Sequence, residues 1–116
     1  MSNVRATLPR TARLRGPTQF TGAFQQRYRS RHFLLLIRPG GSIEGSARLG
    51  IVIGRKQIAG AAGRARMRRI IREVFRFRRH QLGQIDMVVR YLATDGRCTD
   101  VAIRSELNEL FARATA

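Results

Sequence analysis

The residues best suited to do chemistry in this chain are arginines that gather between positions 63 and 76. Six of these fourteen residues are arginine: Arg64, Arg66, Arg68, Arg69, Arg72 and Arg76. A guanidinium group is planar, keeps its charge and can bind a phosphate through two parallel hydrogen bonds. The segment therefore indicates a polyanion as its partner.

The apolar residues of the same segment have the spacing of one helical face. They are Met67, Ile70, Ile71, Val74 and Phe75, at positions i, i+3, i+4, i+7 and i+8. At about 100° per residue, the later arginines fall together on the opposite side. Such a helix packs one side on a core and presents guanidinium groups on the other, where they repel each other until an anion neutralises them.

The length and net charge of the chain also agree with a small domain that binds a polyanion. The chain has 116 residues, which predicts one domain, and a hydrophobic content of 43%, which is ordinary for a globular protein. Its formal net charge is +16, and Lys56 is the single lysine among 23 basic residues. An excess of this size favours nucleic acid or an anionic membrane surface as partner.

The composition also argues against several classes of protein. No run approaches the ~18 apolar residues of a membrane helix, and the first residues lack the apolar region of a signal peptide. Cys98 is the single cysteine, which excludes an internal disulfide and a cysteine-based zinc site. We therefore expect a cytoplasmic protein that does not enter the membrane.

No catalytic arrangement stands out among the titratable residues. The seven acidic residues are scattered, with no close pair that would hold Mg²⁺ for two-metal hydrolysis. His32 and His80 lie in different predicted elements; a catalytic pair remains an alternative, although surface contacts are the favoured interpretation. We predict no catalytic residue and no metal ligand in this chain.

The elements that would position the arginines follow the order helix, strands, helix, strand, helix. Residues 1–13 are predicted to be a flexible basic arm and residues 14–116 the domain. Pro17 suits the start of a first helix that carries Phe20 and Phe24. The later helices are the arginine helix, ending near Arg79, and a last helix capped by Thr99 or Asp100.

Strands are predicted at residues 33–37, 49–54 and 85–91. The run at 39–42, rich in Pro and Gly, is expected to close a hairpin between the first two strands, and residues 27–31 are expected to be a basic link. Together these elements predict an α+β domain with one sheet. Phe20, Phe24 and Phe33 could stack on bases, but packing into the core is the stronger alternative for each.

Several short motifs occur in a fixed order along the chain. The first are Leu8-Pro9, Arg13-Leu14, Gln19-Phe20 and Arg31-His32-Phe33. A strand of alternating apolar residues then leads from Arg48 to the basic pair Arg55-Lys56. The densest group follows it: Ala61-Ala62, Arg64-Ala65-Arg66, Arg68-Arg69, Arg72-Glu73 and Phe75. Asp86 precedes another apolar strand, and an amphipathic helix closes the chain.

In this order and spacing the motifs resemble the protein subunit of bacterial ribonuclease P, over residues 8–112. The chain departs from that family's pattern at Ala65, where the family has Asn between the two arginines, and at Ala62, where Val is usual. Leu36 stands where some members carry an aromatic residue.

The resemblance implies a fold: an α/β sandwich of the ribosomal-protein type. It has one mostly antiparallel sheet of about four strands, three helices and a left-handed βαβ crossover around the arginine helix. It also implies a role, because in this family the RNA subunit is the catalyst. That RNA uses Mg²⁺, which it mainly binds itself, to cut the 5′ leader from precursor tRNA. The protein is an accessory subunit, expected here to be a monomer.

The resemblance assigns two groups of contacts. Binding of the RNA subunit is expected at Arg55, Lys56, Arg64, Arg66, Arg68, Arg69 and Arg72. Binding of the precursor tRNA leader is expected at Phe20, Phe24, Phe33 and Arg48, in a cleft between the first helix and the sheet.

Two other functions remain as alternatives. A noncatalytic RNA-binding protein of the ribosomal type has the same composition and lacks only the ordered motifs. A DNA-binding regulator is disfavoured, because no short second helix follows a Gly-containing turn as the helix-turn-helix geometry requires.

Overall fold

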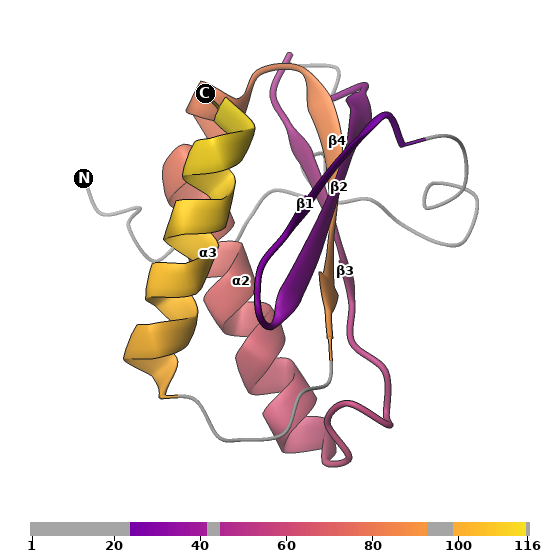
Figure 1. Ribbon diagram of the computed structural model, residues 1–116, viewed down its shortest axis with the longest axis vertical. Helices are drawn as coiled ribbons and strands as arrows, with labels where there is room; N and C mark the ends of the chain where they lie inside the picture. The colour runs from indigo at the N-terminus through magenta and orange to yellow at the C-terminus, as the bar shows by residue number, and fades with distance from the viewer. Residues whose placement is uncertain (1–23, 42–44, 93–98, 116) are drawn as a thin grey trace.

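The structure is a computed structural model of the chain and describes residues 24–41, 45–92 and 99–115. These residues form a four-stranded sheet with two helices. The elements are β1 (Gln26–Arg29), β2 (Phe33–Pro39), β3 (Arg48–Val52), α2 (Ala61–Leu82), β4 (Ile85–Tyr91) and α3 (Asp100–Thr115). Both helices lie on the same face of the sheet (Figure 1).

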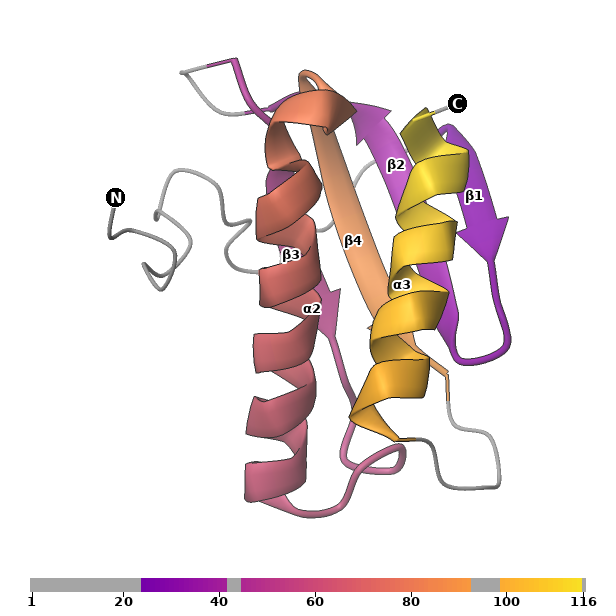
Figure 2. The same ribbon diagram turned by 90° about the vertical axis from the view of Figure 1, so that its left-hand side faces the viewer.

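The strand order is β1-β2-β4-β3, so β4 lies between two strands that precede it in the sequence. It pairs antiparallel with β2 and parallel with β3. Seen from the helical side, β3 runs downward, α2 rises in front of the sheet, and β4 descends to the right of β3 (Figure 2). This crossover is left-handed, against the usual right-handed rule, and the expectation taken from the resemblance is confirmed.

Two local predictions were wrong. The residues expected to be a basic link include β1, an edge strand whose register pairs Gln26 with Ile37. The loop after β2 does not close a hairpin with β3, because β4 separates the two strands. The hairpin partner of β2 is β1. The chain that follows β2 instead leads to β3, which lies on the other side of β4.

The arginine helix forms where its apolar spacing predicts it, and extends to Leu82. Ile70, Ile71, Val74 and Phe75 are all buried. Gly60 precedes the first turn, and Gly83 ends the helix with a φ of 80°, a left-handed backbone conformation that glycine adopts without strain.

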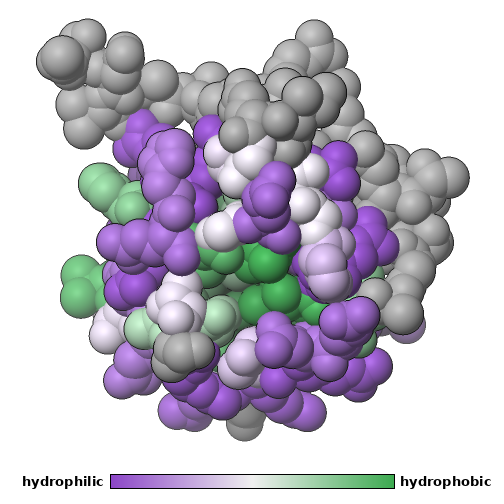
Figure 3. All heavy atoms as spheres, turned by 90° about the horizontal axis from the view of Figure 1, so that it is seen from above, coloured by the Kyte–Doolittle hydropathy of each residue, from purple (hydrophilic) through white to green (hydrophobic). Residues whose placement is uncertain are grey.

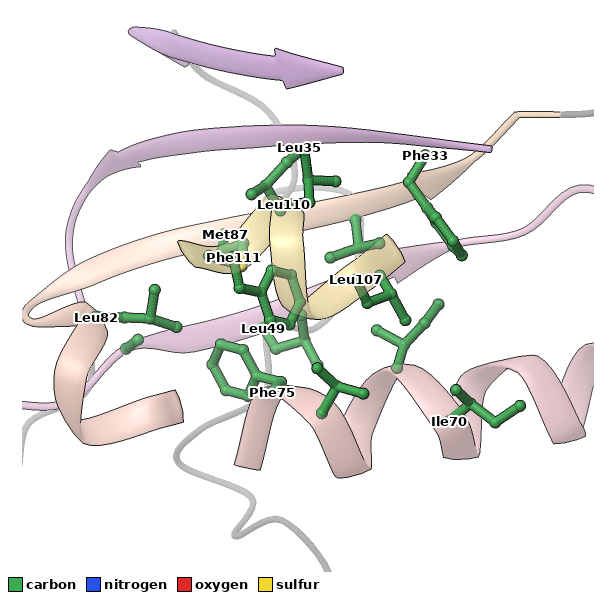
Figure 4. Packing of buried hydrophobic residues seen from close by; sticks show 14 of the residues in the cluster. Phe33, Leu35, Leu49, Ile70, Phe75, Leu82, Met87, Leu107, Leu110 and Phe111 are labelled. Atoms are coloured by element: carbon green, nitrogen blue, oxygen red, sulfur yellow. The ribbon is translucent and has the colours of Figure 1, made fainter. Parts of the chain in front are cut away.

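The core lies between the helices and the sheet. Alternate residues of β2, namely Phe33, Leu35 and Ile37, point toward the helices and are buried, as the period of two in a strand requires. Figure 4 shows side chains of both helices meeting those of β2, β3 and β4. Seen from the end where α2 joins β4, hydrophilic residues surround a small apolar centre (Figure 3).

The third expected helix and the basic arm fall on residues 1–23, outside the described part of the chain. Phe24 is described and is not helical. Within the described segments, neither helix is long and apolar enough to cross a membrane.

Candidate nucleic-acid interface

The face of the sheet turned away from α2 and α3 carries basic side chains at its two ends. Cross-strand partners share a face of a sheet, so Arg38, Asp86 and Arg48, which are paired across β2, β4 and β3, form one row. A second row holds Leu36, Val88 and Gly50, with Arg27 of β1 at its end.

Asp86 binds both arginines of the first row. Its carboxylate accepts hydrogen bonds from Nε of Arg48 at 2.8 Å, from the same guanidinium at 2.9 Å, and from Nε of Arg38 at 3.2 Å. The backbone N–H of Gly41 donates a further bond at 2.9 Å. Burial alone would raise the pKa of Asp86, but the hydrogen bonds from Arg48, Gly41 and Arg38 outweigh it and lower that pKa.

The Asp86 carboxylate therefore fixes two guanidinium groups at one end of the open sheet face. The hydrogen bond to Asp86 is also the main cause that raises the pKa of Arg48. A Cβ atom on Gly40 would lie 2.5 Å from the Asp86 carboxyl carbon, so the close approach of this loop depends on glycine.

Phe24 lies beside the same row. The Arg38 guanidinium carbon is 4.8 Å from the centroid of the half-buried Phe24 ring, within the range of a cation–π contact. The structure thus brings together Phe24 and Arg48, two of the expected leader contacts, through Arg38, which sequence reasoning did not single out. Phe20 lies outside the described residues.

The other end of this face is also basic. Arg29, Leu34, Arg90 and Val52 are cross-strand neighbours. Arg29, Val52 and Arg90 contribute, with Gly54 and Gln57, to the lining of a hollow of about 590 Å³. The open face therefore has arginines at both ends and aliphatic residues in the middle, a surface that suits a strand of nucleic acid.

The assignment of Phe33 to this surface is wrong. Its side chain is 0% exposed, points toward the helices and packs edge-on against Tyr91 with ring centroids 5.6 Å apart. A base could reach this ring only if the core opened, so Phe33 belongs to the core, which was the stronger alternative.

A second basic surface lies at the start of α2. Arg55 and Lys56 are exposed in the turn that precedes this helix. One terminal nitrogen of Arg64 donates to the backbone carbonyls of Ile58 and Ala59, at 2.8 and 2.7 Å. Arg64 therefore holds the turn against the helix, in addition to any contact outside the protein.

The remaining arginines of the helix differ in exposure. Arg66 is bonded to Asp100 of α3 at 2.6 Å, with side chains that are 60% and 42% exposed. Arg69 is exposed, while Arg68 and Arg72 are half-buried. The predicted contacts of the RNA subunit thus lie along one end and one side of α2, as the helical spacing indicated.

Two buried polar groups were missed. Arg79 is 7% exposed, and its Nε donates to the carbonyl of Ala47 at 3.4 Å. Its position could have been found, because it follows the buried Phe75 by four residues and so shares its face. No spacing in the sequence indicated the pair of His32 and Glu106. His32 lies in the turn before β2, whereas Glu106 lies in α3.

Four of the five described carboxylates, all except the exposed Glu109, are engaged with basic or imidazole groups of the protein itself. Glu73 is bonded to Arg104 at 2.6 Å, and Asp86, Asp100 and Glu106 each have a basic or imidazole partner. In the described segments no three Asp, Glu, His or Cys side chains gather as a metal site would require.

A small domain with a net charge of +16, and with arginines on α2 and at both ends of the open sheet face, has the charge distribution of a nucleic-acid-binding protein. A sequence model of the ribonuclease P family matches residues 8–115. The chain belongs to this family, that of the protein component of ribonuclease P.

Curated relatives carry the same description. The ribonuclease P protein component of Bordetella avium is 38% identical over 101 residues, which cover 85% of this chain and 84% of the relative. That of Erwinia tasmaniensis is 33% identical over 110 residues, which cover 95% and 92%.

Solved structures support the fold. The ribonuclease P protein of Thermotoga maritima, in complex with 1-(4-fluorophenyl)-2-thiourea, has a TM-score of 0.63 at 27% identity, covering 76% of this chain and 84% of that one. The Staphylococcus aureus protein has a TM-score of 0.74 at 21% identity, covering 89% and 94%.

Proposed function

We propose that this chain assists the removal of the 5′ leader from precursor tRNA by binding two RNA segments at once. The open sheet face binds the leader, and the start and side of α2 bind the catalytic RNA subunit. The observation that carries this proposal is the pair of separate basic surfaces on one small domain, in a chain that belongs to the ribonuclease P protein family.

The leader surface is formed by Phe24, Arg38 and Arg48 at one end of the open face and by Arg29 and Arg90 at the other. Arginine binds phosphates of any sequence, and an aromatic ring stacks on any base. Such a surface suits leaders that differ in sequence. We include Phe20 in it from the family resemblance.

The RNA-subunit surface comprises Arg55, Lys56, Arg64, Arg66, Arg68, Arg69 and Arg72. Its groups lie on the turn before α2 and on the side of that helix away from the core. They are well placed to neutralise closely spaced phosphates, and each contact would release counterions. The protein would therefore bind the RNA less tightly as salt rises.

The chemistry is assigned to the RNA subunit. When bound there, Mg²⁺ would activate the water that attacks the scissile phosphate. The described residues of the protein supply positioning and charge neutralisation, and we propose that they hold no metal ion of their own. We also propose that the protein is a monomer when free and acts in the cytoplasm.

A cleavage assay tests this function. Precursor tRNA is incubated with the RNA subunit at limiting Mg²⁺, with and without this chain, and with the chain alone. We expect release of the leader by the RNA with the protein and none by the protein alone. Cleavage by the RNA-free protein would overturn the assignment of chemistry. If the chain does not stimulate the RNA, the ribosomal-type alternative would be favoured.

A further inference from the structure

Phe77 is an aromatic residue that α2 presents to solvent. It is 72% exposed, and among the described residues it and Val101 are the large apolar side chains most open to solvent. An exposed Phe contributes nothing to the core, and a single exposed apolar side chain is common on protein surfaces, so the case for a partner at Phe77 depends on the groups around it.

The backbone beneath Phe77 is held in place. One turn earlier, Glu73 accepts a hydrogen bond from Arg104 of α3 at 2.6 Å. At the next residue, Arg78 donates from Nε to Asn108 of α3 at 3.3 Å. These two bridges join α2 to α3 on either side of Phe77, so the ring projects from a fixed site.

The surroundings of the ring are cationic. The Arg76 guanidinium carbon lies 5.5 Å from the Phe77 centroid. From residue 69 to the end of α2 there are five arginines and one acid, and that acid, Glu73, is bonded to Arg104. Exposed His80 follows Phe77 by three residues, and exposed Arg69 precedes it by eight residues, or about 12 Å along the helix axis. Both lie within about 80° of Phe77 around the helix at 100° per residue.

We propose that Phe77 is a stacking site for an unpaired RNA base, with Arg76 and Arg69 contacting the adjoining phosphates. The proposal rests on the proposed function for the identity of the RNA, and it extends the RNA contact of α2 to the C-terminal half of the helix. The site is separate from the open sheet face, because α2 covers the other side of the sheet (Figure 2).

The charges favour RNA over a protein as the partner. A protein surface that covered Phe77 would have to neutralise the arginines around it with acids, whereas a nucleotide brings both a ring and a phosphate. The Arg76 guanidinium already lies over one face of the Phe77 ring. A base stacked on the other face would leave both faces of the ring in favourable contact.

The chain contains no tryptophan, so Phe77→Trp places a single reporter at the site. Stacking of a base on the indole should quench its emission when a single-stranded oligoadenylate or the RNA subunit is added. A blunt RNA duplex, with the same phosphates but no free base, should leave the emission nearly unchanged. Val101→Trp is the control for the oligoadenylate measurement, because Val101 is 77% exposed at the start of α3, and its emission should change less than that of Phe77→Trp. It is not used with the RNA subunit, because the neighbouring Asp100 is bonded to Arg66, a proposed contact of that RNA.

Affinity provides the second measurement. Phe77→Ala and Phe77→Leu should each weaken binding of the RNA subunit about tenfold, or ~1.4 kcal/mol, with an unchanged melting temperature, while Phe77→Tyr keeps it. Retention by Phe77→Leu would overturn stacking and indicate an apolar contact. Quenching by the duplex, or no quenching by either RNA, would also overturn it. Failure of the wild-type chain to stimulate cleavage would instead contradict the proposed function, since the oligoadenylate measurement does not depend on the RNA subunit.

Discussion

His32 and Glu106 are separated by 74 residues in the sequence, yet the His32 ring Nδ1 lies 2.7 Å from Oε1 of Glu106. The backbone N–H of His32 donates to the same carboxylate at 2.6 Å, and the hydroxyl of Ser30 donates to it as well. One carboxylate thus ties α3 to the turn between β1 and β2. Burial would raise the pKa of Glu106, but the bonds from Ser30 and His32 outweigh it and lower that pKa.

The lowered pKa of this group predicts a pH dependence of stability. A carboxyl whose pKa is lower in the folded state stabilises the fold fully above its unfolded pKa, and loses that contribution as pH falls through the folded value. The ordinary values are 4.5 for Glu106 and 3.8 for Asp86. The free energy of unfolding should therefore be level with respect to these groups above about pH 5 and fall below pH 4, as measured by urea titration at each pH.

The variant Glu106→Gln distinguishes the contribution of Glu106 to this pH dependence from that of Asp86. The neutral amide accepts weaker hydrogen bonds from Ser30 and His32, so stability at pH 7 should fall by about 2 kcal/mol. The acid-induced loss should become shallower, because Asp86 would be the one of these two carboxyl groups that still contributes. An unchanged acid profile in this variant would show that Glu106 does not contribute to it.

Asp86→Asn should destabilise the protein strongly. It removes the buried charge that holds Arg38 and Arg48, and breaking a buried pair of this kind costs roughly 3–5 kcal/mol. The matched control is Asp100→Asn, which breaks the exposed pair with Arg66 and should change stability little. Thermal melting of both variants tests the comparison, and equal losses would contradict the role given to the buried row.

Arg69→Ala should weaken binding of the RNA subunit and leave the melting temperature unchanged. The Arg69 side chain is exposed, and a phosphate contact through arginine contributes about 1.5–3 kcal/mol. The slope of log affinity against log salt should fall by about one unit. Arg64→Ala is the informative comparison, because it should lose affinity and also loosen the turn at Ile58 and Ala59.

Phe24→Ala should weaken binding of precursor tRNA and leave mature tRNA, which has no leader, nearly unchanged. Stacking on one base contributes on the order of 1–3 kcal/mol. Phe33→Ala should behave differently: it should lower stability by about 3–5 kcal/mol, as loss of a buried Phe does, and affect both RNAs alike. Affinities for both tRNAs and a melting curve for each variant decide the matter, and an equal effect of Phe24→Ala on both RNAs would exclude a leader contact.

The part of the fold that sequence reasoning predicted is the part set by local periodicity. The spacing from Met67 to Phe75 identified α2, and the apolar run from Ile85 to Tyr91 gave the bounds of β4. In contrast, β1 was missed because its residues, Gln26–Arg29, have no apolar pattern of their own. This strand exists because the edge of β2 offers it backbone partners, a non-local cause that a window of sequence does not contain.

The candidate site was predictable in composition but not in geometry. The arginines of α2 were evident, whereas the row of Arg38, Asp86 and Arg48 depends on the register of β4 between two earlier strands. The sequence favoured the core for Phe33 but did not exclude a place on the open face, since both faces of β2 carry apolar residues. The handedness of the crossover came from family resemblance, because general packing rules favour the opposite hand.

The central place of β4 has a consequence for how the chain emerges from the ribosome. The strands β2 and β3 are made first, but each keeps an unpaired edge until β4 enters between them. α3 follows later still and supplies Leu107, Leu110 and Phe111 to the core. A nascent chain therefore contains its arginines and apolar strands before it can form the sheet and core that bury the apolar residues and leave the arginines exposed. We expect folding to await synthesis of β4 and α3, and chains truncated before α3 to be targets for chaperones and proteases.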